Sequence, residues 1–234
     1  SYLEQRLARK VELVQRGSYR EITEMLLDGR CDAAWICGFP YVRFREVFRL
    51  VAVPLFEGKP LYRSYLIVPA SDTATHSILD LRGKVFAFSD PDSNSGYLYP
   101  NFVLRRSGER SEAFFRRSFF TWAHRKVVDA VSASLAHGGA VDGYVWETLR
   151  VSSGALTAGT RVAHKSPEFG HPPIVASALA APETVEALRG VLTGMNRDPD
   201  GRALLARLNL DGFAPGNDQL FDSIEKMWRV VQPV

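Results

Sequence analysis

Apolar positions along the chain follow two different periods. Short apolar runs bounded by turn residues predict strands, and apolar residues repeated every three or four positions predict amphipathic helices. The predicted strands are residues 10–14, 31–38, 47–56, 62–70, 84–89, the start of 140–149 and two segments within 161–179. The predicted helices are the front of 2–15, 18–29, one that begins within 88–104, 111–120, 126–139 with a Gly-Gly stop, 182–210 and 218–232, with a short helix or turn at 77–83. This alternation favours an α/β fold with mostly parallel sheets.

Composition narrows the classes of partner. The chain has 234 residues, of which 46% are hydrophobic and 24% charged, enough for one large domain or two lobes. Its 29 Lys and Arg residues are scattered among 26 acidic residues, so no basic stripe marks a nucleic-acid site. No apolar run approaches the ~20 residues that cross a bilayer, and no signal-like segment precedes the first helix. We therefore expect a soluble chain with no nucleic-acid partner, any export signal having been removed or lying outside the sequence.

The two cysteines are predicted to remain thiols. Cys31 and Cys37 fall on one predicted strand, where a rise of about 3.3 Å per residue separates their Cα atoms by roughly 20 Å. A disulfide requires less than about 7 Å. Neither cysteine is therefore expected to form a disulfide with the other.

A hydroxyl-rich turn lies between a strand and a helix in "FSDPDSNSGYLYPNFVL", residues 88–104. Ser93, Asn94 and Ser95 are residue types that cap helix starts, and Gly96 allows close approach to the backbone. The first N–H groups of a helix lack internal partners and carry partial positive charge, so this turn suits a small oxyanion. Plain helix capping explains the same residues. Pro100 removes one donor and is expected to loosen the first turn or delay the helix.

The order of motifs around this turn resembles a known family. The segments are "DAAWICGFPYV", "YRSYLIVPASD", "LDLRGKVFAFSDPDSNSGYLYP", "AHRKVVDAV" and "DPDGRALLARLNLDGF". Together they are similar to the phosphate/phosphonate-type periplasmic substrate-binding proteins of ABC transporters. The resemblance implies a type 2 periplasmic-binding fold, in which two α/β lobes joined by two hinge strands close on a ligand. Lobe 1 would comprise residues 1–66 and 168–234, and lobe 2 residues 67–167.

The resemblance also implies a binding role, without catalysis, for particular residues. The oxyanion would bind at Ser93, Asn94 and Ser95, although the family usually has Thr where Asn94 stands. His124 and Tyr41 match a histidine and an aromatic residue that line the family's cleft. The implied ligand is phosphate, phosphite or a phosphonate, and the implied partner is an ABC permease or a membrane sensor kinase. We expect an extracytoplasmic monomer without a cofactor.

A histidine stands where the family commonly has an acidic residue. His171 in "FGHPPIV" occupies that position if the alignment of the loop is correct, and Glu168 occupies it if the alignment shifts. A neutral histidine accepts a hydrogen bond and a charged one donates. The two alternatives imply ligands of different charge or protonation.

Three further residues are expected at the ends of strands. Cys37 ends a predicted strand, and ligands of open α/β sheets bind at such strand ends. One interpretation is that its thiolate binds trivalent arsenic in a sensor protein. The other is that Cys37 is a small apolar residue buried in the core. Trp146 and Glu147 end the predicted strand "VDGYVW" and are expected to point toward the cleft. Core packing for Trp146 and a helix-start charge for Glu147 are the simpler interpretations.

The first lobe departs from the family in its first element. Such proteins normally begin with a central strand, whereas this sequence begins with a predicted helix. Either the sequence is a shortened form or the lobe lacks that strand, which would expose unpaired strand edges.

A hydrolase and a metalloprotein are the alternatives from other classes. Ser93, His124 and Asp142 could form a Ser-His-Asp set, but the sequence has no Gly-x-Ser-x-Gly elbow. The five histidines show no ligand spacing with the cysteines, so we expect no metal site.

Overall fold

The chain forms two compact α/β units. The structure is a computed structural model that describes residues 1–232. Unit 1 comprises Ser1–Leu61 and Phe169–Asp222, and unit 2 comprises Tyr62–Glu168 together with the segment from Ser223 onward. The chain therefore passes between the units after residues 61, 168 and 222. The resemblance assigned the C-terminal segment to the first lobe, whereas its contacts group it with unit 2.

Unit 1 is built on a four-stranded sheet in the order β1-β8-β2-β9. These strands are β1 (Ala33–Trp35), β8 (Ile174–Ala176), β2 (Arg49–Leu55) and β9 (Gly212–Ala214). Its helices are α1 (Tyr2–Leu7), α2 (Tyr19–Leu27), α3 (Gly38–Arg43), α9 (Pro182–Gly194) and α10 (Pro199–Leu208), with short 3-10 turns η3 (Met195–Arg197) and η4 (Asp218–Phe221). The pairs β1–β8, β2–β8 and β2–β9 are all antiparallel, so the prediction of mostly parallel sheets is wrong for this unit.

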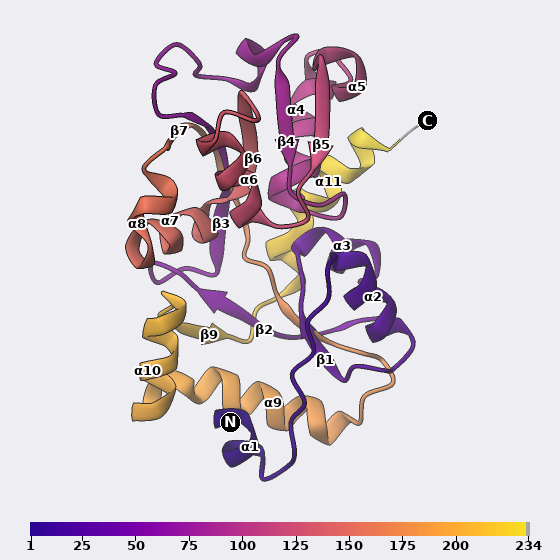
Figure 1. Cartoon of the computed structure of the whole chain (residues 1–234). Helices are drawn as coiled ribbons and strands as arrows, with labels where there is room; N and C mark the ends of the chain where they lie inside the picture. The colour runs from indigo at the N-terminus through magenta and orange to yellow at the C-terminus, as the bar shows by residue number, and fades with distance from the viewer. Residues whose placement is uncertain (233–234) are drawn as a thin grey trace. The chain divides into compact units, whose positions relative to one another are not determined.

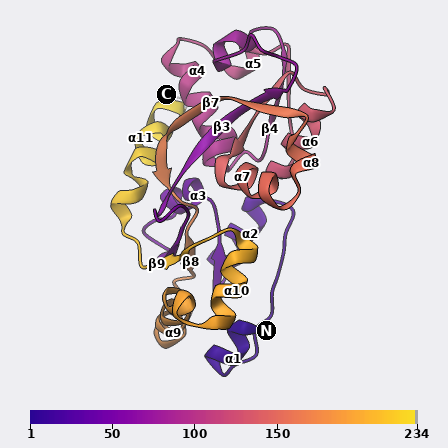
Figure 2. The ribbon, with the colours of Figure 1, turned by 90° about the vertical axis from the view of Figure 1, so that its left-hand side faces the viewer.

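Unit 2 contains a five-stranded sheet in the order β5-β4-β6-β3-β7 (Figures 1 and 2). These strands are β5 (Arg117–Phe120), β4 (Val85–Phe88), β6 (Gly138–Asp142), β3 (Leu61–Pro69) and β7 (Thr160–Gly170). Its helices are η1 (Ile78–Leu81), η2 (Asn94–Leu98), α4 (Tyr99–Arg106), α5 (Ser111–Phe114), α6 (His124–Ser132), α7 (Gly143–Ser152), α8 (Gly154–Thr157) and α11 (Asp222–Val231). Strand β4 is parallel to β5 and β6, and β3 is antiparallel to β6.

Helices cover both faces of the unit 2 sheet because its central strands are apolar on both sides. Along β4, Val85 and Ala87 pack toward Val127 and Val131 of α6. Phe86 and Phe88 point to the other face, where they meet Leu104 of α4, Phe114 of α5 and the next residue, Phe115. Figure 2 shows α4 on one side of the sheet and α6 and α8 on the other. The sequence of a strand that is buried on both faces is a continuous apolar run, and β4 has the sequence "VFAF" with all four residues buried.

Several element boundaries differ from the prediction. Residues 10–14 form no strand, and the strand predicted over 31–38 is limited to Ala33–Trp35, with α3 beginning at Gly38. The predicted helix 111–120 ends at Phe114, and its last four residues, Arg117–Phe120, form the edge strand β5. The Gly-Gly pair that was predicted to stop a helix opens strand β6. The strand predicted to reach Trp146 ends at Asp142, so Trp146 and Glu147 lie in α7.

The two glycines of β6 are required by close packing. A Cβ atom on Gly139 would lie 2.4 Å from Cγ1 of Val127 and 3.0 Å from the carbonyl oxygen of Ala87. A Cβ atom on Gly138 would lie 2.5 Å from Cδ1 of Leu81. These glycines therefore let α6 and η1 approach the sheet from its two faces.

Gly139→Ala is expected to destabilise the protein by about 1–3 kcal/mol, because the added methyl group overpacks the contact between α6 and β6. Urea unfolding measures this change. Gly154→Ala is the matched control, since a Cβ atom at Gly154 in α8 meets nothing within 4 Å. The control should unfold at the wild-type urea concentration or slightly above it. Equal stability of the two variants would contradict the packing argument.

Candidate functional site

The candidate site of unit 2 lies where three neighbouring parallel strands end. Ser89 follows β4, His124 lies shortly after β5, and Asp142 is the last residue of β6. Because β5, β4 and β6 are adjacent and parallel, their carboxyl ends meet at one edge of the sheet. Ligands of open α/β sheets bind at such an edge.

The turn after β4 leads into a wide first turn of helix. Ser93 caps this turn, since its Oγ accepts a hydrogen bond from the N–H of Gly96 at 3.0 Å. The N–H of Leu98 bonds the carbonyl of Ser93 at 2.9 Å, five residues back, and η2 is a π-helical turn that continues as α4. Pro100 has no N–H to offer the carbonyl of Gly96, which instead accepts the N–H of Ser89 at 3.4 Å. The first turn is therefore wider than an α-helical one, which agrees with the loosened turn that was one of the two outcomes expected at Pro100.

Buried hydroxyl groups gather at this helix start. Ser89, Ser93 and Ser95 are each no more than 1% exposed. Among residues 1–232, the Oγ atoms of Ser89 and Ser95 have no hydrogen-bond partner. Buried hydroxyls are normally paired, and leaving one unpaired costs about 1–3 kcal/mol. A ligand that accepts hydrogen bonds would therefore compensate for this cost.

Strand β3 fixes the turn from behind. The Oγ of Ser64 donates to the carbonyl of Ser95 at 2.7 Å. The side-chain amide of Asn94 donates to the hydroxyl of Tyr62 at 2.9 Å. The side-chain amide of Asn94 is therefore partly occupied by a bond within the protein, and the hydroxyl groups available to a ligand are those of the serines.

Gly96 is required by the backbone's approach to Ser89. A Cβ atom at Gly96 would lie 1.8 Å from Oγ and 2.7 Å from Cβ of Ser89. No side chain fits there without displacing Ser89. The glycine of the motif therefore serves close packing of the turn against the end of β4.

His124 is held in one tautomer by its neighbour. The backbone N–H of Asp142 donates to Nδ1 of His124 at 3.1 Å. Burial lowers the pKa of His124 to about 4, so the imidazole is neutral at physiological pH. With Nδ1 accepting, the single proton is on Nε2. His124 therefore offers one N–H donor without a charge.

Asp142 is a buried carboxyl group beside this histidine. Its Oδ1 accepts the N–H of Val145 at 3.2 Å and caps α7. Burial raises the pKa of Asp142 to about 7, although backbone hydrogen bonds act in the opposite direction. The contact between Asp142 and His124 runs through the backbone of Asp142, and Ser93 bonds Gly96. Within residues 1–232, these three residues therefore do not form the chain of side-chain hydrogen bonds that a Ser-His-Asp hydrolase uses.

The predicted residues of unit 1 lie on α3 and after β7. Cys37 is buried at the start of α3 and forms no disulfide. Tyr41 is buried in α3, where its hydroxyl donates to Asp218 and its ring packs 4.8 Å from that of Phe221. Burial and then the bond to Asp218 raise the pKa of Tyr41. The buried His171 has its pKa lowered to about 4 by burial.

The two remaining residues have structural partners within unit 2. Trp146 is part of the hydrophobic core, and its Nε1 donates to Oγ1 of Thr160 at 3.2 Å. Trp146 therefore packs in the core and does not point toward a ligand, contrary to the expectation for it.

Glu147 has charged and polar partners on its own unit. It forms ion pairs with Arg150 at 2.8 Å and Lys165 at 3.9 Å, and it accepts a hydrogen bond from the hydroxyl of Tyr65 at 3.1 Å. Glu168, the alternative to His171, pairs with Arg63 at 3.3 Å.

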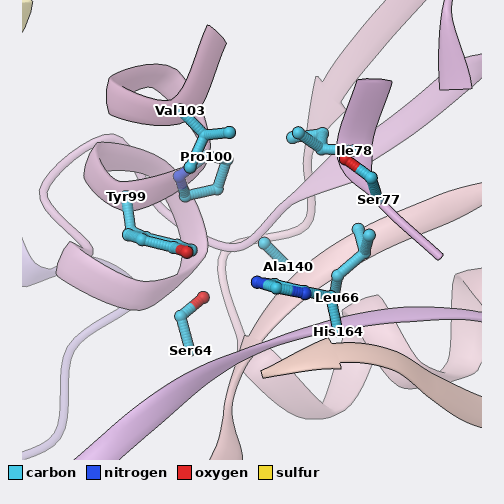
Figure 3. Close-up of a pocket in the computed structure, with 9 residues that line it drawn as sticks. All are labelled: Ser64, Leu66, Ser77, Ile78, Tyr99, Pro100, Val103, Ala140 and His164. Atoms are coloured by element: carbon cyan, nitrogen blue, oxygen red, sulfur yellow. The ribbon is translucent and has the colours of Figure 1, made fainter. Parts of the chain in front are cut away.

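A small pocket lies behind the turn on the α4 face of the sheet (Figure 3). The hydroxyls of Ser64 and Tyr99 and the imidazole of His164 face it, and Val103 and Ile78 form part of its apolar wall. Its volume is about 50 Å³, which is enough for a few water molecules. Ser64 lines this pocket and also bonds the turn, whereas Ser89, Ser93, Ser95 and His124 are not among the lining residues.

Two other properties concern residues 1–232. No helix in this range is long and apolar enough to span a membrane. Within the same range, no cluster of three or more His, Cys, Asp or Glu side chains is placed to hold a metal ion.

Sequence reasoning missed the residues that support the turn. Ser89 was not among the predicted site residues, because its unpaired, buried hydroxyl depends on the close packing of Gly96. Tyr62 and Ser64 belong to β3, about 30 residues earlier, and no local signal connects them to the turn. Trp122, after β5, donates its N–H to the carbonyl of Ser89 at 2.6 Å and was not singled out.

Solved structures place this architecture in a known class. The chain superposes with a TM-score of 0.89 on a binding protein component of an ABC phosphonate transporter from Pseudomonas aeruginosa, at 21% identity over 98% of this chain and 78% of that one. It superposes with a TM-score of 0.87 on PhnD1 of Prochlorococcus marinus in complex with methylphosphonate, at 18% identity over 97% of this chain and 88% of that one. The fold is that of type 2 periplasmic-binding proteins, as the sequence predicted.

A family model and a relative then identify the family. The model of the periplasmic substrate-binding proteins of phosphonate ABC transporters matches residues 1–221, and the chain belongs to this family. The phosphate-import protein PhnD of Mycolicibacterium smegmatis is 26% identical, over 98% of this chain and 73% of that protein. The resemblance seen in the sequence is therefore confirmed. Substrate binding for transport is favoured over the sensor and hydrolase alternatives.

The raised pKa of Asp142 predicts a pH dependence of stability. Between about pH 4 and pH 7 the folded protein keeps a proton on Asp142 that the unfolded chain has lost, so the contribution of Asp142 to the free energy of unfolding falls as pH rises through this range, while the lowered pKa values of His124 and His171 act in the opposite direction. Asp142→Asn keeps a capping side chain and does not titrate. At pH 8 the variant should be more stable than wild type, by at most about 4 kcal/mol at about 1.4 kcal/mol per pKa unit.

Denaturant unfolding at pH 4, 6 and 8 measures this difference. The exposed Asp129→Asn on α6 is the matched control and should follow the wild-type pH profile. If the stabilities of Asp142→Asn and wild type change in parallel between pH 4 and pH 8, the pKa of Asp142 is not raised in the folded protein and the assignment is wrong.

Proposed function

We propose that this chain is the substrate-binding component of an ABC transporter and that it binds a phosphorus oxyanion at the Ser93–Gly96 turn of unit 2. The observation that carries the proposal is the buried Oγ of Ser95, which has no hydrogen-bond partner among residues 1–232 although it lies at the start of a helix. The family implies a small anionic ligand and a membrane permease as partner.

The donors of the turn suit an oxyanion. Ser95 and Ser89 have hydroxyl hydrogens to donate, and Ser93 accepts from Gly96 while its own O–H remains a donor. His124 adds the neutral Nε2–H donor. A phosphorus oxyanion presents several acceptor oxygens, and hydrogen bonds to a charged acceptor are the strong ones. The positive end of the helix supports the same charge.

The named ligands of related proteins support phosphorus chemistry. The Mycolicibacterium smegmatis relative is a phosphate-import protein, and the Prochlorococcus marinus structure contains methylphosphonate. Phosphate, phosphite and phosphonates remain the proposed ligand class. The proposal is binding without catalysis by an extracytoplasmic monomer that has no nucleic-acid partner. Tyr41, His171 and Cys37 of unit 1 are retained as candidate ligand residues.

The first experiment is a thermal-shift panel followed by calorimetric titration. Phosphate, phosphite, methylphosphonate, sulfate and arsenite are compared on wild type, Ser95→Ala and Cys37→Ser. A ligand that binds only the folded protein raises the melting temperature. Ser95→Ala should weaken binding of the phosphorus oxyanion about tenfold or more, because a hydrogen bond to a charged group contributes roughly 1.5–3 kcal/mol.

Ser118→Ala is the matched control, because Ser118 is an exposed serine on β5 of the same unit. It should bind with wild-type affinity. The proposal fails if no phosphorus oxyanion shifts the melting temperature, or if Ser95→Ala and Ser118→Ala bind equally well. A shift with arsenite alone that disappears in Cys37→Ser would move the chemistry to the thiol. Ester hydrolysis that is lost in Ser93→Ala would show an enzyme.

A further inference from the structure

Trp122 has a backbone conformation that bulky residues rarely adopt. Its φ is 64°, in the left-handed region, where a Cβ atom is crowded by the following carbonyl and glycine is favoured. The other non-glycine residues with positive φ are Ala8, Glu57, Ser134 and Asn209, and none of these is aromatic. Such outliers persist where the surrounding structure enforces them, and they cluster at ligand sites.

The ends of β4 and β5 enforce this conformation. The N–H of Trp122 donates to the carbonyl of Ser89 at 2.6 Å, and the N–H of Thr121 donates to the carbonyl of Phe88 at 2.9 Å. The hydroxyl of Thr121 also bonds the carbonyl of Ala123 at 3.0 Å. The backbone of Trp122 is thus fixed directly beside Ser89, which follows β4 and has an unpaired buried hydroxyl, and it lies two residues before His124.

The indole extends an aromatic row that begins at the turn. Tyr97 follows Gly96, and its ring lies 5.4 Å from that of Phe120. The ring of Phe120 lies 5.9 Å from that of Trp122, which is 51% exposed. The row therefore runs from the helix start to an exposed aromatic side chain. Packing in the hydrophobic core therefore accounts neither for the position of this half-exposed side chain nor for the backbone conformation of Trp122.

We propose that Trp122 contacts the organic group of an organophosphonate whose oxyanion is bound at the Ser93–Gly96 turn. This inference rests on the proposed function and specifies the ligand class. In a phosphonate, one oxygen of phosphate is replaced by carbon, which accepts no hydrogen bond from the serine or histidine donors. An apolar or aromatic substituent packs favourably on an indole. Inorganic phosphate has no such substituent, so Trp122 sets the preference between the two.

The experiment compares phosphate, methylphosphonate and phenylphosphonate by calorimetric titration on wild type, Trp122→Gly and Trp122→Phe. Trp122→Gly should bind phosphate within about twofold of wild type. It should lose about fourfold in affinity for methylphosphonate, the value of one buried methyl group, and tenfold or more for phenylphosphonate. Trp122→Phe should recover most of the phenylphosphonate affinity. Trp122→Gly should unfold at or above the wild-type temperature, since glycine relieves the backbone conformation.

Ser134→Gly is the matched control, because Ser134 is exposed in the same unit and has a φ of 57°. It should relieve a similar conformation and leave all three affinities unchanged. Equal losses for the three ligands in Trp122→Gly would show that Trp122 only supports the turn or His124, and the inference would be wrong. Unchanged affinities for all three ligands would show that the indole serves another partner. If wild type binds none of them, the proposed function fails and this inference fails with it.

Discussion

The contact between Gly96 and Ser89 is the constraint on which the candidate site depends. It brings the start of a helix against the end of a buried strand so closely that no side chain fits at position 96. The same contact buries the hydroxyl of Ser89 and leaves it without a partner among residues 1–232. Pro100 follows this turn and has no N–H to donate to the carbonyl of Gly96, which accepts the N–H of Ser89 instead. Close packing and unsatisfied donors are therefore two results of one turn geometry.

Neighbouring strands supply the rest of the site through their backbones. Asp142 at the end of β6 fixes the tautomer of His124, and Ser89 at the end of β4 fixes the backbone of Trp122. Each side chain is thus positioned by the strand beside it. This arrangement ties the orientation of the donors to the pairing of β5, β4 and β6, which is set by the hydrophobic core on both faces of the sheet.

The turn itself could be predicted from sequence because capping chemistry is local. Ser93 does cap the helix start, and the alternation of strands and helices did indicate an α/β fold. Tertiary effects could not be predicted in the same way. Gly138 and Gly139 were predicted to stop a helix, but they lie in strand β6. Glycine is needed at both positions because α6 and η1 pack closely against them. Trp146 was predicted to end a strand. Asp142 is a residue type that caps helices, and its position before Gly143 could have indicated that α7 begins there. His124 was predicted as a site residue only through the family resemblance, since its orientation depends on a backbone group 18 residues away.

The strand order of unit 1 has a consequence for synthesis of the chain. Strands β1 and β2 do not pair with each other, because β8 lies between them and pairs with both. β8 comes from the second segment of unit 1, after all of Tyr62–Glu168 has been made. On the ribosome, domains generally fold as units while the chain emerges. The central sheet of unit 2 is then available first, and the N-terminal strands of unit 1 wait unpaired until β8 emerges, which makes them the part of the nascent chain most exposed to wrong pairing.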